Sequence, residues 1–212
     1  MKYERIPLGP LQTNGYLIYE NGRALIIDPG GEPGKLLSRI RELKLEVEAV
    51  LLTHAHFDHI GALEQVRDEL NCPVYLHKEE KDWLGSPQLN GSGVFPGIEP
   101  VECREADYLW KEEGEKQVGS FFFYLFETPG HSPGSVTYYF INEEAAFSGD
   151  VLFRGGVGRT DLHGGDQETL MKSIHDKLLV MNDETEVLNG HGPSTVIGEE
   201  KETNPFINGF GW

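Results

Sequence analysis

The first part of the chain alternates short apolar runs with turn residues, which predicts strands followed by a helix. We predict strands over Lys2–Pro7, Tyr16–Tyr19 and Ala24–Ile27, with a hairpin turn at Asn21-Gly22. Pro33 suits the first turn of a helix. The apolar residues that follow it recur at helical spacing: Leu36, Leu37, Ile40 and Leu43.

The next apolar run, Val47–Leu52, predicts a strand that is buried on both faces. A helix follows, marked by apolar residues at Leu63, Val66 and Leu70. After it we predict a short strand at Val74–Leu76 and one or two helical turns over Lys78–Leu84. The stretch Leu84–Pro100 is rich in Gly, Pro, Ser and Asn, which predicts a long loop. Such a loop is either a plain surface excursion or a lid over a substrate, for which Trp83 and Phe95 would supply the aromatic cover.

The second half repeats this mixture of strands and helices. Asp166 is a candidate N-cap for a helix with an apolar stripe at Leu170, Ile174 and Leu178, and a Gly-rich loop spans Val151–Gly165. Phe121–Phe126 is so aromatic that we expect it to be core. The predicted strands of this half are Phe121–Phe126, Ser135–Phe140, Ala145–Phe147 and Glu186–Leu188. This pattern predicts an α/β fold, and the length of 212 residues predicts a single domain spanning 1–212.

Charge and cysteine content narrow the possible partners and the compartment. The formal net charge is −17, so we expect no binding to nucleic acid or to anionic membranes. Residues 1–12 contain no secretory apolar region, and no apolar run reaches the ~18 residues of a membrane span. We therefore predict a cytoplasmic protein in which Cys72 and Cys103 are free thiols.

The candidate chemistry begins at Thr53–His59, where His54, His56, Asp58 and His59 follow a buried strand. Buried His and Asp side chains need hydrogen-bond partners or a metal ion. Three further candidates also follow predicted strands and have a neighbouring glycine: His131, Asp150 and His191. Four such strand ends together indicate a metal site rather than a polar loop.

The donor types and their spacing also constrain the metal chemistry. Imidazole and carboxylate ligands without a thiolate suit Zn, Fe or Mn. In an extended segment His54 and His56 would point the same way, because side chains alternate with a period of two. Asp58 and His59 are adjacent, and we expect their side chains to diverge.

The ordered motif His-x-His-x-Asp-His, then a lone His, a lone Asp and a final His, resembles the metallo-β-lactamase superfamily. Within it the chain is most similar to small bacterial glyoxalase II-like hydrolases, through Gly158-Arg159-Thr160-Asp161-Leu162 and Asn204-Pro205-Phe206. The resemblance implies an αββα sandwich, with two mixed sheets and helices on the outer faces. It also implies two divalent metal ions, with Zn favoured and Fe or Mn compatible. Its ligand sets are His54, His56 and His131 for the first ion, Asp58, His59 and His191 for the second, and Asp150 as the bridge.

This resemblance implies hydrolysis of a small-molecule thioester by a metal-bridging hydroxide, with Asp58 and Asp150 as catalytic residues. A thiolate, whose parent thiol has a pKa of ~8.5, departs without a strong general acid. Only 21 residues follow His191, so we expect no C-terminal helical domain of the kind that helps longer glyoxalase II enzymes bind glutathione. The thiol is therefore open. We predict substrate contacts from Arg159, Arg154 and Phe95, in the loops 84–100 and 151–165.

Two other functions stay open at this point. The chain also resembles persulfide dioxygenases, which hold one iron through the equivalents of His54, His131 and Asp150. A non-catalytic metal or redox scaffold is a third class, although it would leave an open di-metal shell unexplained. Lactonase, β-lactamase and nuclease activities rank lower, since the sequence contains no added domain or basic groove.

Several residues outside the motif have two interpretations. Asp28 either supports the ligand loop, as in the family, or caps the turn before Pro29. Arg159 and Asp161 either shape the metal edge or form a buried pair that holds the loop. The C-terminal aromatic residues dock on the core or form a dimer contact, so monomer and homodimer both stay open: Phe206, Phe210 and Trp212.

Overall fold

The computed structural model describes residues 1–209, so the predictions for Phe210 and Trp212 lie outside the described residues. The chain divides into two compact units. The first comprises 1–111 with 117–121, and the second comprises 112–116 with the residues from 122 on. Each unit is considered by itself below, and the single-domain organisation stays a prediction.

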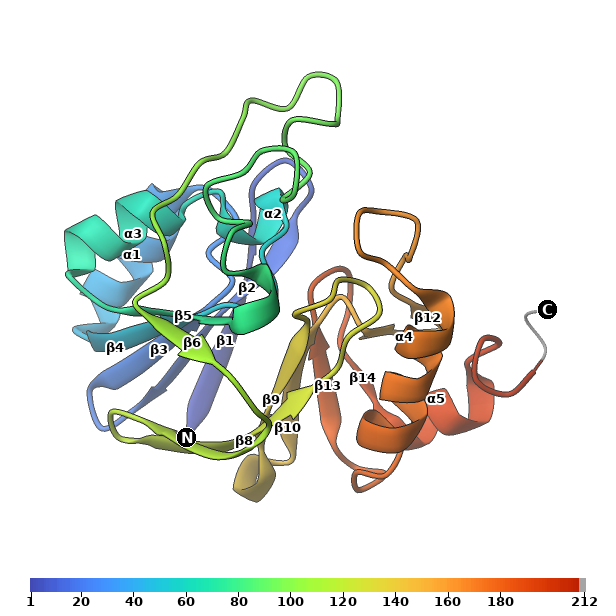
Figure 1. Cartoon of the computed structure of the whole chain (residues 1–212). Coiled ribbons are helices and arrows are strands. Elements are labelled where there is room, and N and C mark those ends of the chain that lie inside the picture. Colours follow the sequence, from blue (N-terminus) through green and yellow to red (C-terminus); the bar gives the residue numbers. More distant parts are fainter. Residues whose placement is uncertain (210–212) are drawn as a thin grey trace. The chain divides into compact units, whose positions relative to one another are not determined.

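A mixed six-stranded sheet forms the centre of the first unit (Figure 1). The first three strands pair antiparallel, and the last three continue the sheet in parallel. The hairpin turn after the second strand forms as predicted, because Asn21 and Gly22 both take the positive φ that a two-residue turn requires. In spatial order the strands are β1 (Lys2–Leu8), β2 (Thr13–Glu20), β3 (Arg23–Ile27), β4 (Glu46–Leu51), β5 (Val74–His77) and β6 (Tyr108–Trp110).

Two helices cover one face of this sheet. Helix α1 (Pro33–Leu43) buries Leu36 and Ile40, and α3 (Leu63–Leu70) buries Leu63 and Val66, all in one cluster with side chains of the sheet. The predicted apolar spacing of both helices is therefore confirmed. Between them the chain forms a single helical turn, α2 (Phe57–Ile60), and a 3-10 turn follows β5, η1 (Lys78–Glu80).

A second mixed six-stranded sheet lies largely in the second unit, in the order β14-β13-β10-β9-β8-β7. The pair β10 and β13 is parallel, while the β8–β9, β9–β10 and β13–β14 pairs are antiparallel. The strands are β7 (Gly114–Val118), β8 (Phe121–Glu127), β9 (Val136–Phe140), β10 (Ala145–Gly149), β13 (Glu186–Asn189) and β14 (Thr195–Val196). The predicted class, α/β with two mixed sheets and helices, is confirmed.

The helices of the second unit also pack on one face of their sheet. Asp166 caps α4 (Gln167–Ser173) by accepting a 2.7 Å hydrogen bond from the backbone N–H of Thr169, as predicted. The predicted stripe continues from α4 into a π-helical turn, η3 (Ile174–Leu178), and α5 (Ile197–Thr203) adds Ile197 to the same core. In Figure 1 these helices are the orange and red ribbons.

The sequence pattern missed the short and polar elements. It did not predict β6, β7, β14 or α5, because these elements have few apolar residues or span only two or three positions. A 3-10 turn, η2 (Ile141–Glu143), follows β9. The predicted loop Val151–Gly165 contains a small hairpin, β11 (Leu152–Phe153) with β12 (Gly156–Val157). The prediction that all of Phe121–Phe126 is core was wrong, because β8 alternates between buried and exposed faces and leaves Phe122 68% exposed.

Two further sequence predictions concern the surface of the molecule. Among residues 1–209, no helix combines the length and the apolar character needed to cross a membrane. Phe206 is 37% exposed, so the residue is only partly covered, and both docking on the core and a dimer contact stay open for it.

Phenylalanines in two strands of the second sheet, β10 and β8, allow a matched test of this core. Phe147 is fully buried against Phe140, with 5.7 Å between ring centroids, whereas Phe122 is largely exposed. We expect Phe147→Ala to lower the free energy of unfolding by about 3–5 kcal/mol, because truncation leaves a cavity. The control, Phe122→Ala, should change it by less than about 0.5 kcal/mol. Urea unfolding followed by circular dichroism measures both, and equal losses would contradict the assigned faces of β8 and β10.

Candidate metal centre

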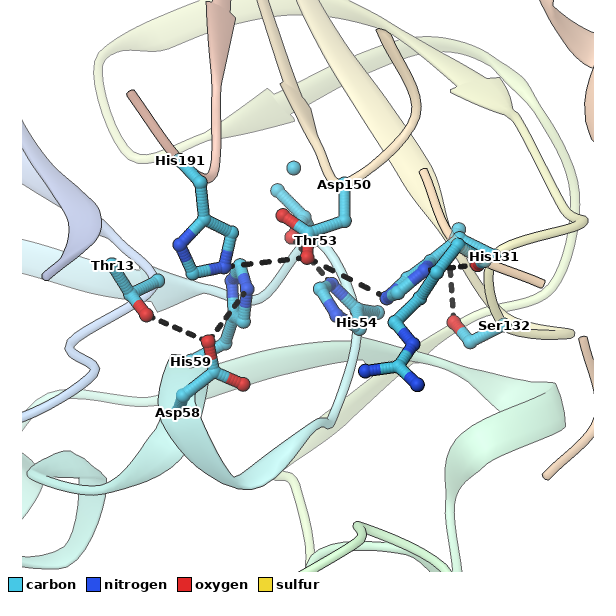
Figure 2. A network of polar contacts seen from close by, with 12 residues as sticks. Thr13, Thr53, His54, Asp58, His59, His131, Ser132, Asp150 and His191 are labelled. Atoms are coloured by element: carbon cyan, nitrogen blue, oxygen red, sulfur yellow. Dashed lines mark hydrogen bonds and ion pairs between the residues drawn. The ribbon is translucent and has the colours of Figure 1, made fainter. Parts of the chain in front are cut away.

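The predicted metal ligands fall into two sets, one in each unit, and Figure 2 labels six of the seven. The first set follows strand β4: His54 and His56 lie in the loop after it, and Asp58 and His59 lie in α2. His54 and His59 are fully buried, and His56 is nearly so. The second set comprises His131 after β8, Asp150 after β10 and His191 after β13.

The side chains of the first set converge. The ligand atoms of His54 and His56 lie within 4.8 Å of each other, as do those of His54 and His59 and those of Asp58 and His59. The first pair confirms that His54 and His56 point the same way. The prediction that Asp58 and His59 diverge was wrong: His59 Nε2 lies 3.6 Å from Asp58 Oδ2, because the chain has entered a helical turn at this point.

Hydrogen bonds to a buried carboxylate set the tautomers of two of these histidines. Asp28 is 1% exposed, and its Oδ2 accepts hydrogen bonds from His59 Nδ1 at 2.9 Å and from the Thr53 hydroxyl at 2.6 Å. Since the Thr53 hydroxyl has given its one proton to Asp28, it accepts from His54 Nδ1, at 3.0 Å. Both imidazoles therefore carry their proton on Nδ1 and present Nε2 as a lone pair, the form that binds a metal ion. This network supports the first interpretation of Asp28, as the residue that holds the ligand loop.

Asp58 is oriented by a different contact. The Thr13 hydroxyl, at the start of β2, donates a 2.7 Å hydrogen bond to Asp58 Oδ2 (Figure 2). The backbone beneath it is packed tightly, because a Cβ atom on Gly30 would lie 1.9 Å from the carbonyl oxygen of Asp58. Only glycine fits at position 30, and this close approach fixes the start of α2 against the turn after β3.

The second set is built around Asp150. His131 Nε2 lies 3.6 Å and His191 Nε2 lies 3.4 Å from Asp150 Oδ2. The backbone carbonyl of Arg159 accepts a 2.8 Å hydrogen bond from His131 Nδ1, which again leaves Nε2 as the lone pair. Gly158 permits this contact, because a Cβ atom there would lie 2.0 Å from the Asp150 carbonyl oxygen.

The distances within each set fit metal ligation better than direct hydrogen bonding. The separations from imidazole nitrogen to carboxylate oxygen are 3.4–3.6 Å, longer than the 2.7–3.2 Å typical of an N–H···O bond. Two ligands on one tetrahedral ion, each about 2.1 Å from it, would stand about 3.4 Å apart. The donor set of neutral imidazoles and carboxylates therefore suits a Zn, Fe or Mn ion in chemistry as well as in spacing.

The predicted substrate residues have partners of their own. Arg159 forms two hydrogen bonds with Asp161, at 2.7 and 2.8 Å, and both side chains are more than half exposed, so this is not a buried pair. Arg154 pairs with Glu199 at 3.0 Å on the surface. Phe95 contacts Phe57, with 5.8 Å between ring centroids. Substrate binding by Arg154, Arg159 and Phe95 stays a prediction, as do the catalytic roles of Asp58 and Asp150.

The structure also adds residues that the sequence reasoning missed. Thr13, Glu80 and Asn90 are fully buried polar residues that bond to the ligand-bearing segment or its backbone. None belongs to a motif or follows a predicted strand that ends at a ligand. Each lies among polar or small residues, so a single sequence does not separate these three from surface positions.

The two thiols are not candidate nucleophiles. Burial raises the pKa of Cys72 and of Cys103 to about 11, and both are free cysteines as predicted. We expect both to stay protonated at pH 8 and to react with iodoacetamide more slowly than a cysteine in the unfolded chain, by at least about 100-fold. Mass spectrometry of the alkylated protein, with and without urea, measures this ratio. Rapid alkylation of the folded protein would contradict the assigned burial.

Asp28 offers a test of tautomer control. In Asp28→Asn the amide has lost the charge that holds His59 Nδ1–H and the Thr53 hydroxyl, so we expect metal affinity to fall about 10–100-fold. Competition with a chromophoric chelator measures the dissociation constant, and Asp82→Asn, at an exposed position, is the matched control. Equal affinities in the two variants would show that Asp28 does not set the ligands.

The chain matches a family model and curated relatives along most of its length. The model of the metallo-beta-lactamase superfamily matches residues 8–191. The chain is 53% identical over 210 residues to the probable metallo-hydrolase YqgX of Bacillus subtilis, covering 99% of each protein. It is 40% identical over 210 residues to the hydroxyacylglutathione hydrolase GloC of Haemophilus influenzae, covering 98% of this chain and 99% of the relative.

Solved structures agree with these relatives. The BLEG-1 B3 metallo-beta-lactamase superposes with a TM-score of 0.95 at 50% identity, covering 97% of this chain and 99% of that one. TTHA1623 in a di-iron-bound form superposes with a TM-score of 0.86 at 42% identity, covering 96% of this chain and 99% of that one. ETHE1 from Myxococcus xanthus superposes with a TM-score of 0.77 at 30% identity, covering 99% of this chain and 85% of that one. Because the family model matches most of the chain and these relatives align with it over nearly its whole length, the chain belongs to the metallo-β-lactamase superfamily and has the metallo-β-lactamase fold.

Proposed function

We propose that this metallo-hydrolase cleaves thioesters of a low-molecular-weight thiol, giving a carboxylate and the free thiol. The proposal depends most on one observation: within each unit, a buried imidazole, that of His59 or His131, presents Nε2 at ligand spacing to a carboxylate. In support, GloC, 40% identical over nearly the whole chain, is named a hydroxyacylglutathione hydrolase.

The proposed centre contains two ions. His54, His56 and His131 would hold the first, Asp58, His59 and His191 the second, and Asp150 both. Asp150 suits the bridging role because it already faces two imidazoles within its own unit, those of His131 and His191. Such a pair of ions supplies Lewis acidity for the substrate carbonyl and lowers the pKa of a coordinated water. The relative TTHA1623 in a di-iron-bound form supports a two-ion site in which iron is an alternative to zinc.

Neighbouring residues of this chain hold the proposed ligands in the orientation and tautomer that metal binding requires. Asp28 and the carbonyl of Arg159 hold the histidines in the tautomer that binds metal, and Thr13 holds the carboxylate of Asp58. A thioester suits the centre because its leaving thiolate, from a thiol with a pKa of ~8.5, needs no strong proton donor. A β-lactam releases an amine and does need one, so it ranks second as a substrate, although BLEG-1 is named a B3 metallo-beta-lactamase.

An iron-dependent persulfide dioxygenase is the alternative function. The stretch Gly158–Asp161 resembles that family, and its backbone carbonyl at Arg159 supports His131, one of the three iron ligands that such an enzyme would need. The likeness to ETHE1 at 30% identity is compatible with either function.

Metal content and substrate turnover together test the proposal. We expect protein purified without added metal to contain two ions per chain and to hydrolyse S-lactoylglutathione or another acyl-thiol faster than a β-lactam such as nitrocefin. Asp150→Ala should lose at least about 100-fold in turnover together with its metal. The exposed Asp176→Ala is the control and should keep both.

Two outcomes would contradict this function. Fully metal-loaded protein that turns over no acyl-thiol would exclude thioester hydrolysis. A single iron per chain, with oxygen consumption in the presence of a thiol persulfide, would establish the alternative.

A further inference from the structure

The segment from Glu80 to Val101 is folded against the turn that carries the first ligand set. It contains the loop that the sequence predicts as a lid or a surface excursion. Yet Glu80, Asn90 and Ser92 are at most 1% exposed, and Trp83 is 4% exposed. Buried polar side chains are retained where they make specific hydrogen bonds, so the partners of these residues indicate what the segment does.

Glu80 bonds to the backbone between two ligands. Its Oε2 accepts a 2.6 Å hydrogen bond from the backbone N–H of Ala55, the residue that separates His54 from His56. A hydrogen bond to a carboxylate is roughly twice as strong as a neutral one, and a buried carboxylate is costly unless it is bonded in this way. The contact therefore fixes the backbone unit that sets the spacing of the two imidazoles.

Asn90 accepts a hydrogen bond from the backbone amide of Phe57, two residues after Ala55. The acceptor is the backbone carbonyl oxygen of Asn90, 2.9 Å from the amide nitrogen of Phe57. Phe57 is the first residue of α2 and directly precedes Asp58. The N–H groups of a first helical turn have no partner within the helix, so this bond fixes where α2 begins. The segment thus holds alternate amides of the ligand turn, at Ala55 and at Phe57.

The side chain of Asn90 keeps the segment in this shape. Its Nδ2 donates to the carbonyls of Trp83, at 3.2 Å, and Val101, at 2.9 Å, which lie on either side of it in the sequence. Its Oδ1 accepts from the N–H and the hydroxyl of Ser92, at 3.0 and 2.7 Å. The amide therefore makes four hydrogen bonds, and it joins both ends of the loop to its middle.

Aromatic contacts complete the support. The Trp83 ring lies 5.6 Å from that of His56, and the Phe95 ring lies 5.8 Å from that of Phe57. The outer part of the loop is different, because Val94 is 58% exposed. Most of residues 93–100 are exposed, as a lid would be.

We propose that Glu80 and Asn90 are positioning residues for the metal ligands, with Glu80 setting the separation of His54 and His56. They act through backbone amides and need not touch the metal or the substrate. This inference rests on the proposed metal centre, although not on the thioester as substrate.

Cobalt binding to the apoprotein tests the role of Glu80 without any turnover assay. We expect Glu80→Ala to bind Co²⁺ about 10–100-fold more weakly than the wild type and to alter the visible absorption of the bound ion. Glu80→Gln keeps an oxygen that accepts from Ala55 N–H but lacks the charge, so its affinity should lie between those two. Glu79→Ala is the matched control, because Glu79 belongs to the same 3-10 turn and is exposed.

The outcomes separate this inference from the proposed function. Wild-type Co²⁺ affinity and spectrum in Glu80→Ala would overturn the inference, even if thioesters are hydrolysed. If Glu80→Ala does not fold, Glu80→Gln decides: a weakened, spectrally altered site supports the inference, and an unchanged one overturns it. Weakened Co²⁺ binding in a protein that cleaves no thioester would support the positioning role and reject the substrate.

Discussion

A histidine binds a metal ion through a ring nitrogen only if that nitrogen carries no proton. The proton of the neutral ring must therefore stay on the other ring nitrogen. Buried imidazoles meet this condition when a fixed acceptor holds the proton, and much of the structure around the ligands provides such acceptors. The carboxylate of Asp28 holds His59 directly and His54 through the Thr53 hydroxyl. A backbone carbonyl, that of Arg159, does the same for His131. These acceptors need a rigid backbone, which the two sheets and their tight glycine contacts supply.

The sequence was sufficient to predict the class of fold and to name candidate ligands at its strand ends. Apolar spacing identified α1, α3 and α4, and strand ends beside glycine indicated His131, Asp150 and His191 as candidate ligands. It failed for β7, whose residues GEKQV are polar because its side chains are largely at the surface. It failed again for the direction of Asp58 and His59, because a single helical turn leaves no periodic signal in four residues.

Support for the ligands was harder to predict than the ligands themselves. Glu80 is 25 residues from the amide it holds, and Thr13 is 45 residues from Asp58. Long-range hydrogen bonds of this kind depend on how strands and loops meet in space, which local pattern does not encode. Asn90 is a clear case: in the sequence it is one more polar residue of a Gly- and Ser-rich loop, while in the structure all four positions of its side-chain amide are bonded.

The bond between His131 and position 159 uses the main chain, and this has an evolutionary consequence. Any residue at position 159 can offer the same carbonyl, provided that Gly158 keeps the backbone close to Asp150. Mutations of the Arg159 side chain therefore leave the acceptor for His131 in place. Selection can change the charge and size of the exposed surface at this point without disturbing the hydrogen bond that holds the His131 imidazole.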